Sequence, residues 1–204
     1  MQENRTKIAG YRTEERIEKI EKVMRKRHKD FTIVAENITD EHNISAVFRS
    51  CDAVGILEAH IVYDGSKPQP KIAERSSASA RKWVDAKYYD NIDDCYAELR
   101  KQGKKIYTTH LDKDSKSLYD LDLTEPFAIV VGNEHSGVTD RAVELADANV
   151  LIPQVGMIQS LNISVACAVS IYEAFRQRLK AGKFDNIGLP EEEYQAKLKE
   201  FLEK

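Results

Sequence analysis

The chain has 204 residues, 42% of them hydrophobic and 32% charged, with a formal net charge of −3. This length suits one domain, and no apolar run is long enough to span a bilayer. Because residues 1–5 also lack the apolar region of a secretion signal, we expect a cytoplasmic protein with no membrane segment.

The first half of the sequence predicts alternating helices and strands. Residues 13–28 form a charged amphipathic pattern, with Thr13 as a helix cap, and residues 31–35 read as a buried strand. A helix from Asn43 to Val54 should end at Gly55, before a strand over 59–63.

The alternation continues to the end of the chain. We expect a short helix near 71–79, strands near 84–88, 105–109 and 127–131, helices over 92–102 and 138–146, an extended segment over 149–152, a long helix from about 161 to 181, and a last helix over 191–204. Repeated alternation of this kind predicts an α/β fold with a mostly parallel sheet and helices on both faces. We divide the chain into a basic helical extension (1–30), a central domain (31–182), and a linker with a C-terminal helix (183–204).

Cysteine and histidine spacing argues against a metal centre. Cys51, Cys95 and Cys167 are odd in number and lack C-x-x-C spacing, and none of the five histidines forms an H-x-x-x-H pair. We expect reduced, buried thiols and no bound metal.

Positive charge is concentrated at the start of the chain. Residues 1–30 carry ten Lys or Arg against six Asp or Glu, so this segment is at +4 and the rest of the chain at −7. A second basic stretch includes Arg176 and Arg178. Such charges fit phosphate binding, and they fit equally well a solvated helix with internal ion pairs.

Three polar loops each follow a predicted strand and precede a predicted helix. The first spans Asn37 to Arg49, the second is Gly132-Asn-Glu-His-Ser-Gly137, and the third runs from Ile152-Pro through Gly156 to Ser160-Leu-Asn-Ile-Ser-Val-Ala166. In this order they resemble the signature motifs of the SpoU branch of the SPOUT RNA methyltransferases, N-x-x-x-x-x-N-x-x-A-x-x-R, G-x-E-x-x-G and I-P-x-x-G-x-x-x-S-L-N-x-S-x-A. The flanking sequence is most similar to the TrmH-type tRNA (guanosine-18-2′-O)-methyltransferases.

The resemblance implies a fold, a reaction and partners. It implies the SPOUT sheet with a C-terminal trefoil knot, S-adenosyl-L-methionine as cofactor, tRNA as substrate, and a homodimer with the cofactor pocket near the subunit interface. Ribosomal RNA as the substrate, or an RNA-binding protein that has lost catalysis, are the alternatives. The retained motif residues argue against the inactive protein, and the first motif begins too early for the separate N-terminal RNA-binding domain of many rRNA enzymes.

The resemblance also implies site residues. Arg49 is the central candidate, either as a clamp on the substrate phosphate or as a general base; because an arginine ionises with a reference pKa above about 12, the clamp is favoured at least as well. Glu134 can brace the loop or approach substrate. Asn43, Asn162 and Ser160 can cap helices or address ribose and phosphate.

Two further groups of residues complete the predicted site, the first taken from the resemblance and the second from the distribution of charge. The cofactor candidates are Thr109, Gly132, Ile152 and Leu161, with the adenine held between Ile152 and Leu161. The RNA-binding candidates are the basic residues Arg12, Arg16, Lys26, Arg27, Arg176 and Arg178.

Overall fold

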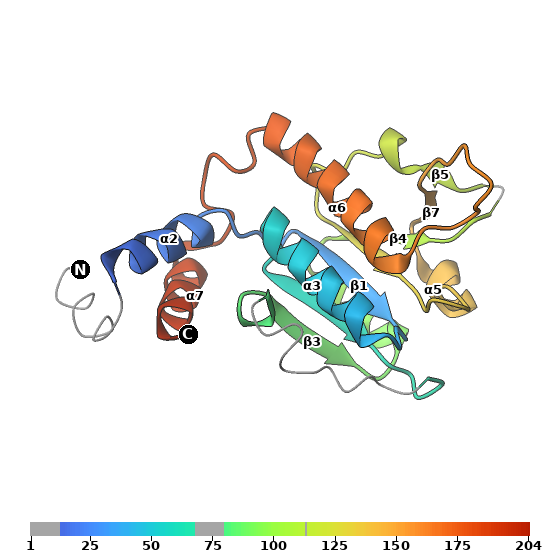
Figure 1. The fold of residues 1–204 in the computed structure, drawn as a ribbon, viewed down its shortest axis with the longest axis horizontal. Helices are drawn as coiled ribbons and strands as arrows, with labels where there is room; N and C mark the ends of the chain where they lie inside the picture. Colours follow the sequence, from blue (N-terminus) through green and yellow to red (C-terminus); the bar gives the residue numbers. More distant parts are fainter. Residues whose placement is uncertain (1–12, 68–79, 113) are drawn as a thin grey trace.

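The computed structural model describes residues 13–67, 80–112 and 114–204 (Figure 1). Its centre is a sheet of seven strands in the order β3-β2-β1-β6-β4-β7-β5, and each neighbouring pair of these strands is parallel. The strands are β1 (Phe31–Glu36), β2 (Glu58–Val62), β3 (Asp85–Tyr89), β4 (Lys105–Thr109), β5 (Lys116–Ser117), β6 (Phe127–Val131) and β7 (Ala148–Leu151). The predicted α/β class with a parallel sheet is confirmed.

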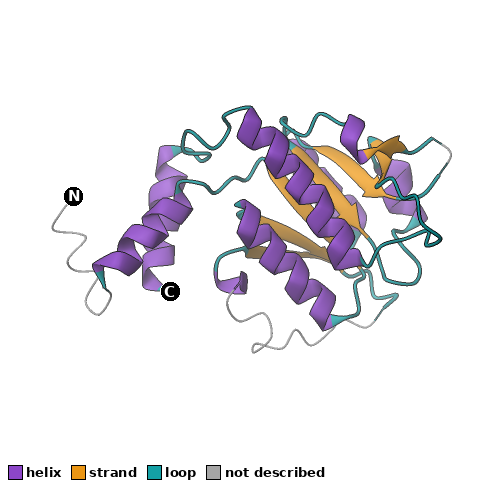
Figure 2. Ribbon diagram, turned by 45° about the horizontal axis from the view of Figure 1, so that its top comes forward, coloured by secondary structure: helices purple, strands orange, loops and turns teal. Residues whose placement is uncertain are grey.

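Helices cover both faces of the sheet, as Figure 2 shows. The helices around the sheet are α3 (Glu41–Val54), α4 (Ile92–Lys101), α5 (Asp140–Leu145) and α6 (Ile163–Lys180). Alternate residues of the central strand β6 serve the two sides: Phe127 and Ile129 pack with α3 and α6, whereas Ala128 and Val130 pack with α4 and α5. Because both faces are buried, this strand is apolar throughout instead of alternating with polar residues.

The terminal helices α2 (Glu14–Met24) and α7 (Glu191–Glu203) pack against each other beside the sheet (Figure 1). Met24 of α2 and Phe201 of α7 are fully buried in their shared core, which also includes Leu57, the residue directly before β2. The Trp83 and Phe201 rings lie 5.2 Å apart and fix α7 to the body. The segments that we expected to flank the domain therefore form one helical pair. No helix in the described residues is long and apolar enough to cross a membrane.

Several element boundaries differ from the predicted ones. Helix α2 begins after its cap Thr13 as expected, but it ends at Met24 because His28 bonds instead to the chain beyond α3, its N–H donating to Gly55 O over 2.9 Å. Helix α3 begins at Glu41 with Asp40 as its cap, so Asn43 is inside the helix.

Other differences concern short or undescribed elements. The helix expected near 71–79 lies outside the described residues, and a 3₁₀ helix, η1 (Ala80–Lys82), follows that segment. The two-residue strand β5 and the 3₁₀ helix η2 (Leu118–Asp120) were not predicted, since two or three residues cannot display a period. The trefoil knot stays a prediction.

All three cysteines are buried and free of disulfides, as expected. Burial raises the pKa of Cys95 to about 12, so this thiol stays protonated at neutral pH. Among the described residues there is no group of three or more His, Cys, Asp or Glu side chains that could hold a metal ion.

Candidate active site

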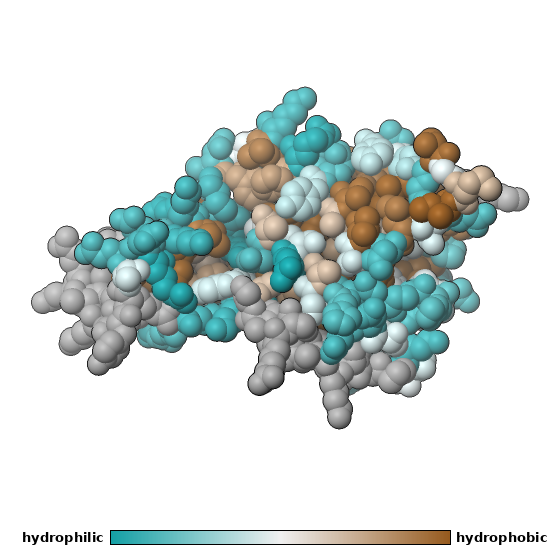
Figure 3. Space-filling view, viewed as in Figure 1, coloured by the Kyte–Doolittle hydropathy of each residue, from teal (hydrophilic) through white to brown (hydrophobic). Residues whose placement is uncertain are grey.

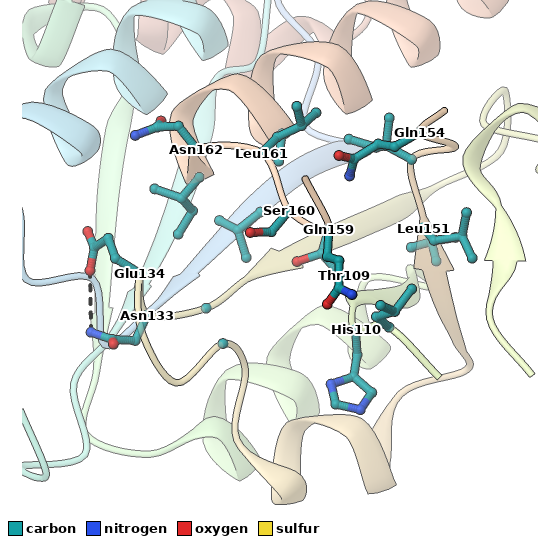
Figure 4. Close-up of a pocket in the computed structure, with 18 of the residues that line it drawn as sticks. Thr109, His110, Asn133, Glu134, Leu151, Gln154, Gln159, Ser160, Leu161 and Asn162 are labelled. Carbon is teal, nitrogen blue, oxygen red and sulfur yellow. Dashed lines mark hydrogen bonds between the residues drawn. The ribbon is translucent and has the colours of Figure 1, made fainter. Parts of the chain in front are cut away.

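A pocket of about 490 Å³ opens at the carboxyl ends of β4, β6 and β7 (Figure 4). Its walls come from residues 109–111 after β4, from residues within 131–137 after β6, and from residues within 150–166 between β7 and α6. The second and third polar loops of the sequence thus meet in one cavity. Parallel strands bring this about, because their carboxyl ends all emerge at the same edge of the sheet.

The second loop is a tight turn that depends on its glycines. The Asn133 N–H donates to Gly137 O over 2.8 Å, and the Gly137 N–H donates back to Asn133 O over 2.9 Å. Gly137 has a φ of 71°, and a Cβ on Gly132 would lie 2.1 Å from the Gly137 carbonyl carbon. Any larger residue at Gly132 would push the turn open.

The Glu134 carboxylate ties the second loop to the first. It accepts hydrogen bonds from the Thr39 N–H (3.3 Å) and hydroxyl (3.2 Å), from the Asp40 N–H (3.3 Å), and from Asn43 Nδ2 (3.1 Å). Burial by itself would raise the pKa of Glu134, but these hydrogen bonds outweigh burial and lower it. An ionised carboxylate with this many donors braces a loop, which was the more cautious of the two roles considered.

Asn43 extends the network from Glu134 to the start of α6. Its Oδ1 accepts a hydrogen bond from Asn162 Nδ2 over 3.2 Å. Asn162 is the N-cap of α6, and its Oδ1 accepts from the Ser164 N–H at 2.8 Å and from the Ser164 hydroxyl at 2.6 Å. Asn162 therefore caps α6 and also connects the third loop to the first.

The remaining candidates on the third loop also lie at the pocket. Ser160 lines the cavity and is exposed, and the cap of α6 is Asn162, so Ser160 is not an N-cap. All four cofactor candidates, Thr109, Gly132, Ile152 and Leu161, line the same cavity. The Thr109 hydroxyl donates to Val130 O over 2.9 Å, which fixes the end of β4 against β6.

Arg49 is not among the residues that line the pocket of this chain. It is exposed on α3, six residues after Asn43, which corresponds to about 9 Å along the helix and a different side of it. The structure thus brings together four of the five catalytic candidates and leaves Arg49 apart within a single chain.

The structure adds residues that the sequence did not single out. Thr39 and Asp40 supply three of the donors to Glu134, and Asn133 donates from its side chain to Asn37 O over 2.9 Å. All of them lie in loops that lead from a strand toward a helix, and this position was the available signal. Gln154, Gln159 and His110 also line the pocket, and Figure 4 shows them around its mouth.

Two RNA-binding candidates were wrong. Arg178 is fully buried, where it pairs with Asp30 and donates to Thr124 O over 2.9 Å. Arg27 is equally buried, pairs with Asp52 and donates to Ile56 O over 3.0 Å. Both guanidinium groups hold backbone carbonyls together and do not reach a phosphate.

The other basic candidates are exposed or lie outside the described residues. Arg16 and Lys26 are exposed on or just after α2, and Lys26 donates to Phe184 O. Arg176 is exposed and pairs with Glu173 at 2.8 Å on the same helix. Arg12 lies outside the described residues.

The fold and the pocket define an α/β protein that holds its ligand at the carboxyl edge of a parallel sheet. The chain belongs to the SpoU methylase family, because the model of the SpoU rRNA Methylase family matches residues 30–172.

Individual relatives agree with this family. The chain is 43% identical over 193 residues to a tRNA (guanosine(18)-2′-O)-methyltransferase of Thermus thermophilus, covering 95% of this chain and 98% of the relative. The solved A. aeolicus TrmH/SpoU tRNA modifying enzyme has a TM-score of 0.85 and 40% identity, over 93% of this chain and 95% of that one. An AdoMet-bound rRNA methyltransferase from Sinorhizobium meliloti has a TM-score of 0.65 and 25% identity, over 75% and 59% of the two chains.

Proposed function

We propose that this protein is a tRNA (guanosine(18)-2′-O)-methyltransferase that uses S-adenosyl-L-methionine. The observation that carries the proposal is the hydrogen-bonded chain Glu134–Asn43–Asn162 beside a pocket lined by Ser160. All three signature motifs contribute to it. The relatives with this activity match nearly the whole chain.

The pocket fits the cofactor. Ile152 and Leu161 offer apolar groups to an adenine ring, Gly132 allows close approach of backbone amides, and the Thr109 side chain stands at the end of β4. When bound there, S-adenosyl-L-methionine would supply an electrophilic methyl group. The cavity volume of about 490 Å³ suits a ligand of this size.

The protein's own part in the reaction is mainly orientation. A ribose hydroxyl is a poor neutral nucleophile, so its alignment with the methyl donor accounts for much of the rate. We assign Arg49 to bind the phosphate next to that ribose in two places, because the guanidinium group is a planar double donor. Asn162 and Ser160 hold the third loop and face the ribose.

We propose that Arg49 acts in the partner subunit of a homodimer. Large apolar side chains are exposed on α6 and on the loop before it, and Figure 3 shows brown atoms gathered over this region. The exposed large side chains on α6 and its preceding loop are Val155, Met157, Ile158, Val165, Tyr172 and Leu179. The last three recur every seven residues on α6, which makes a stripe that a second helix can cover. The exposed Arg49 is carried by α3, which packs beside α6 on the same face of the sheet.

The exposed cations at the helical pair are the proposed contact to the tRNA body. Lys22, Arg25 and Lys26 line a second hollow of about 390 Å³ between α2 and residues 184–187. With Arg16 and Arg176 they form an exposed basic set that can neutralise phosphates. A cytoplasmic location fits this substrate.

Mapping the modified nucleotide tests the proposal. Unmodified tRNA is incubated with the protein and radiolabelled cofactor, and the methylated position is located after digestion. A 2′-O-methyl group at guanosine 18 is expected, and tRNA carrying 2′-deoxyguanosine at that position should take up no label. Label on ribosomal RNA alone would establish the rRNA enzyme instead, and binding of tRNA without any methyl transfer would establish an inactive RNA-binding protein.

A further inference from the structure

Asn37 is the one non-glycine residue among the described residues with a positive φ, 52°. It comes directly after β1 and is buried. Its N–H donates to Val62 O over 2.9 Å, so Asn37 still pairs with the neighbouring strand while its own backbone turns out of the sheet. Asparagine tolerates this left-handed conformation better than most residues with a side chain do.

The Asn37 side chain is held from both ends by Asp64, which follows β2. Asn37 Nδ2 donates to Asp64 Oδ2 over 3.1 Å, and the Asp64 N–H donates to Asn37 Oδ1 over 3.3 Å. Hydrogen bonds from Ser66 hold the pKa of Asp64 below its ordinary value, so the carboxylate is ionised and acts only as an acceptor. The pair therefore requires an amide on one side and a carboxylate on the other.

The turn at Asn37 decides where the next residues go. Ile38 O accepts from the Tyr63 hydroxyl over 2.7 Å, and Asn37 O accepts from Asn133 Nδ2. Residues 39 and 40 then reach Glu134 with three donors, and Glu134 orients Asn43 toward Asn162. Asn37 itself does not line the pocket.

We propose that Asn37 is a positioning residue for methyl transfer: its pairing with Asp64 holds residues 37–40 in the course that fixes Glu134 at the pocket and directs Asn43 toward Asn162. That the reaction is methyl transfer rests on the proposed function. The hydrogen bonds of Asn37 are features of this chain and do not depend on it. An alternative in which Asn37 merely stabilises the sheet predicts loss of stability without a specific loss of rate.

Exchanging the two side chains tests the pairing. Asn37→Asp places two carboxylates together, whereas the double variant Asn37→Asp/Asp64→Asn restores every bond with the roles exchanged, because the Asp64 N–H and Ser66 N–H still find oxygen acceptors. We expect Asn37→Asp to lower kcat at saturating cofactor and tRNA by about tenfold or more, and the double variant to return to within about threefold of the parent.

Two further variants separate the causes. Asn91→Asp is the matched control, since Asn91 Nδ2 also donates to an aspartate, Asp94, but at the exposed cap of α4. We expect it to keep the parental kcat. Asn37→Gly allows the left-handed backbone without the side chain, and we expect it to lower kcat by several-fold. This variant keeps the test decisive even if Asn37→Asp fails to fold.

Amide hydrogen exchange at residues 39 and 40 measures how firmly this segment is held, independently of activity. Methyl transfer by the parent protein tests the proposed function separately. We expect faster exchange in Asn37→Asp and recovery in the double variant. The inference is overturned if Asn37→Asp or Asn37→Gly keeps the parental kcat, or if the double variant stays as slow as Asn37→Asp.

Discussion

Asn162 Nδ2 donates to Asn43 Oδ1 over 3.2 Å, joining residues that are 119 positions apart in the chain. Because Asn43 also donates to Glu134, this hydrogen bond completes a connection between the first, second and third polar loops. The three side chains thus hold one another in place, and removing one amide should displace the other two.

Asn162→Asp should separate the two roles of this residue. A carboxylate still accepts from the Ser164 N–H and caps α6, but it cannot donate to Asn43. We expect the free energy of unfolding to change by less than about 1 kcal/mol, while kcat falls by about tenfold or more. Asn162→Ala should lose about 1 kcal/mol of stability in addition, because it removes the cap. Chemical denaturation and single-turnover assays measure these effects, and parental kcat in Asn162→Asp would contradict the assigned link.

Arg178 and Arg176 are two residues apart on α6, yet they should behave in opposite ways. Arg178→Ala removes the ion pair with Asp30 and three donations to carbonyl oxygens, so we expect a loss of about 3 kcal/mol in the free energy of unfolding. Arg176→Ala should change stability by less than about 0.5 kcal/mol.

Arg176→Ala also tests the proposed RNA contact. Arg176→Ala should reduce the salt dependence of tRNA binding by about one unit of slope for the lost phosphate contact. Lys101→Ala, an exposed lysine on α4, is the control and should leave the slope unchanged. An unchanged slope in Arg176→Ala would remove this residue from the interface.

Acid should destabilise the protein through Glu58. Burial alone would raise the pKa of Glu58, but interactions with His60 and Lys87 outweigh burial and lower the pKa from 4.5 to about 2. A lowered pKa means that the ionised carboxylate stabilises the native state above pH 4.5, and that this contribution is lost as the pH falls toward 2. Urea unfolding across this range should show a steep loss of stability. Glu58→Gln should flatten the loss and Glu203→Gln, on the exposed face of α7, should not; equal slopes for Glu58→Gln and the parent would contradict the assignment.

Mixed dimers decide which subunit supplies Arg49. If Arg49 serves the partner's pocket, a heterodimer of Arg49→Ala with Asn162→Asp contains one intact site and should regain about half of the parental activity. A heterodimer of the parent with the Arg49→Ala/Asn162→Asp double variant should then keep no more than about a tenth of the parental activity. The opposite pattern would place Arg49 in its own subunit's site. Calorimetry on the Arg49→Ala homodimer should show that this variant still binds the cofactor.

The sequence by itself determined most of the elements and their class. Apolar runs such as 127–131 and capping residues such as Thr13 act over a few residues, so their signals can be read locally, and strict alternation of helix and strand leads to a parallel sheet. The residues at the pocket could be named in advance because the three polar loops resemble the SpoU signature motifs. That these loops meet follows from the parallel sheet, whose strands end at one edge.

Only the tertiary structure decided what each of these side chains does. Arg178 and Arg176 look alike in a basic stretch, and burial against Asp30 makes one of them structural while the other stays exposed. In the same way, Asn43 looked like a helix cap but connects Glu134 to Asn162. The physical reason is that burial and hydrogen-bond partners come from segments distant in the chain, and a local pattern carries no information about which distant groups will surround a side chain.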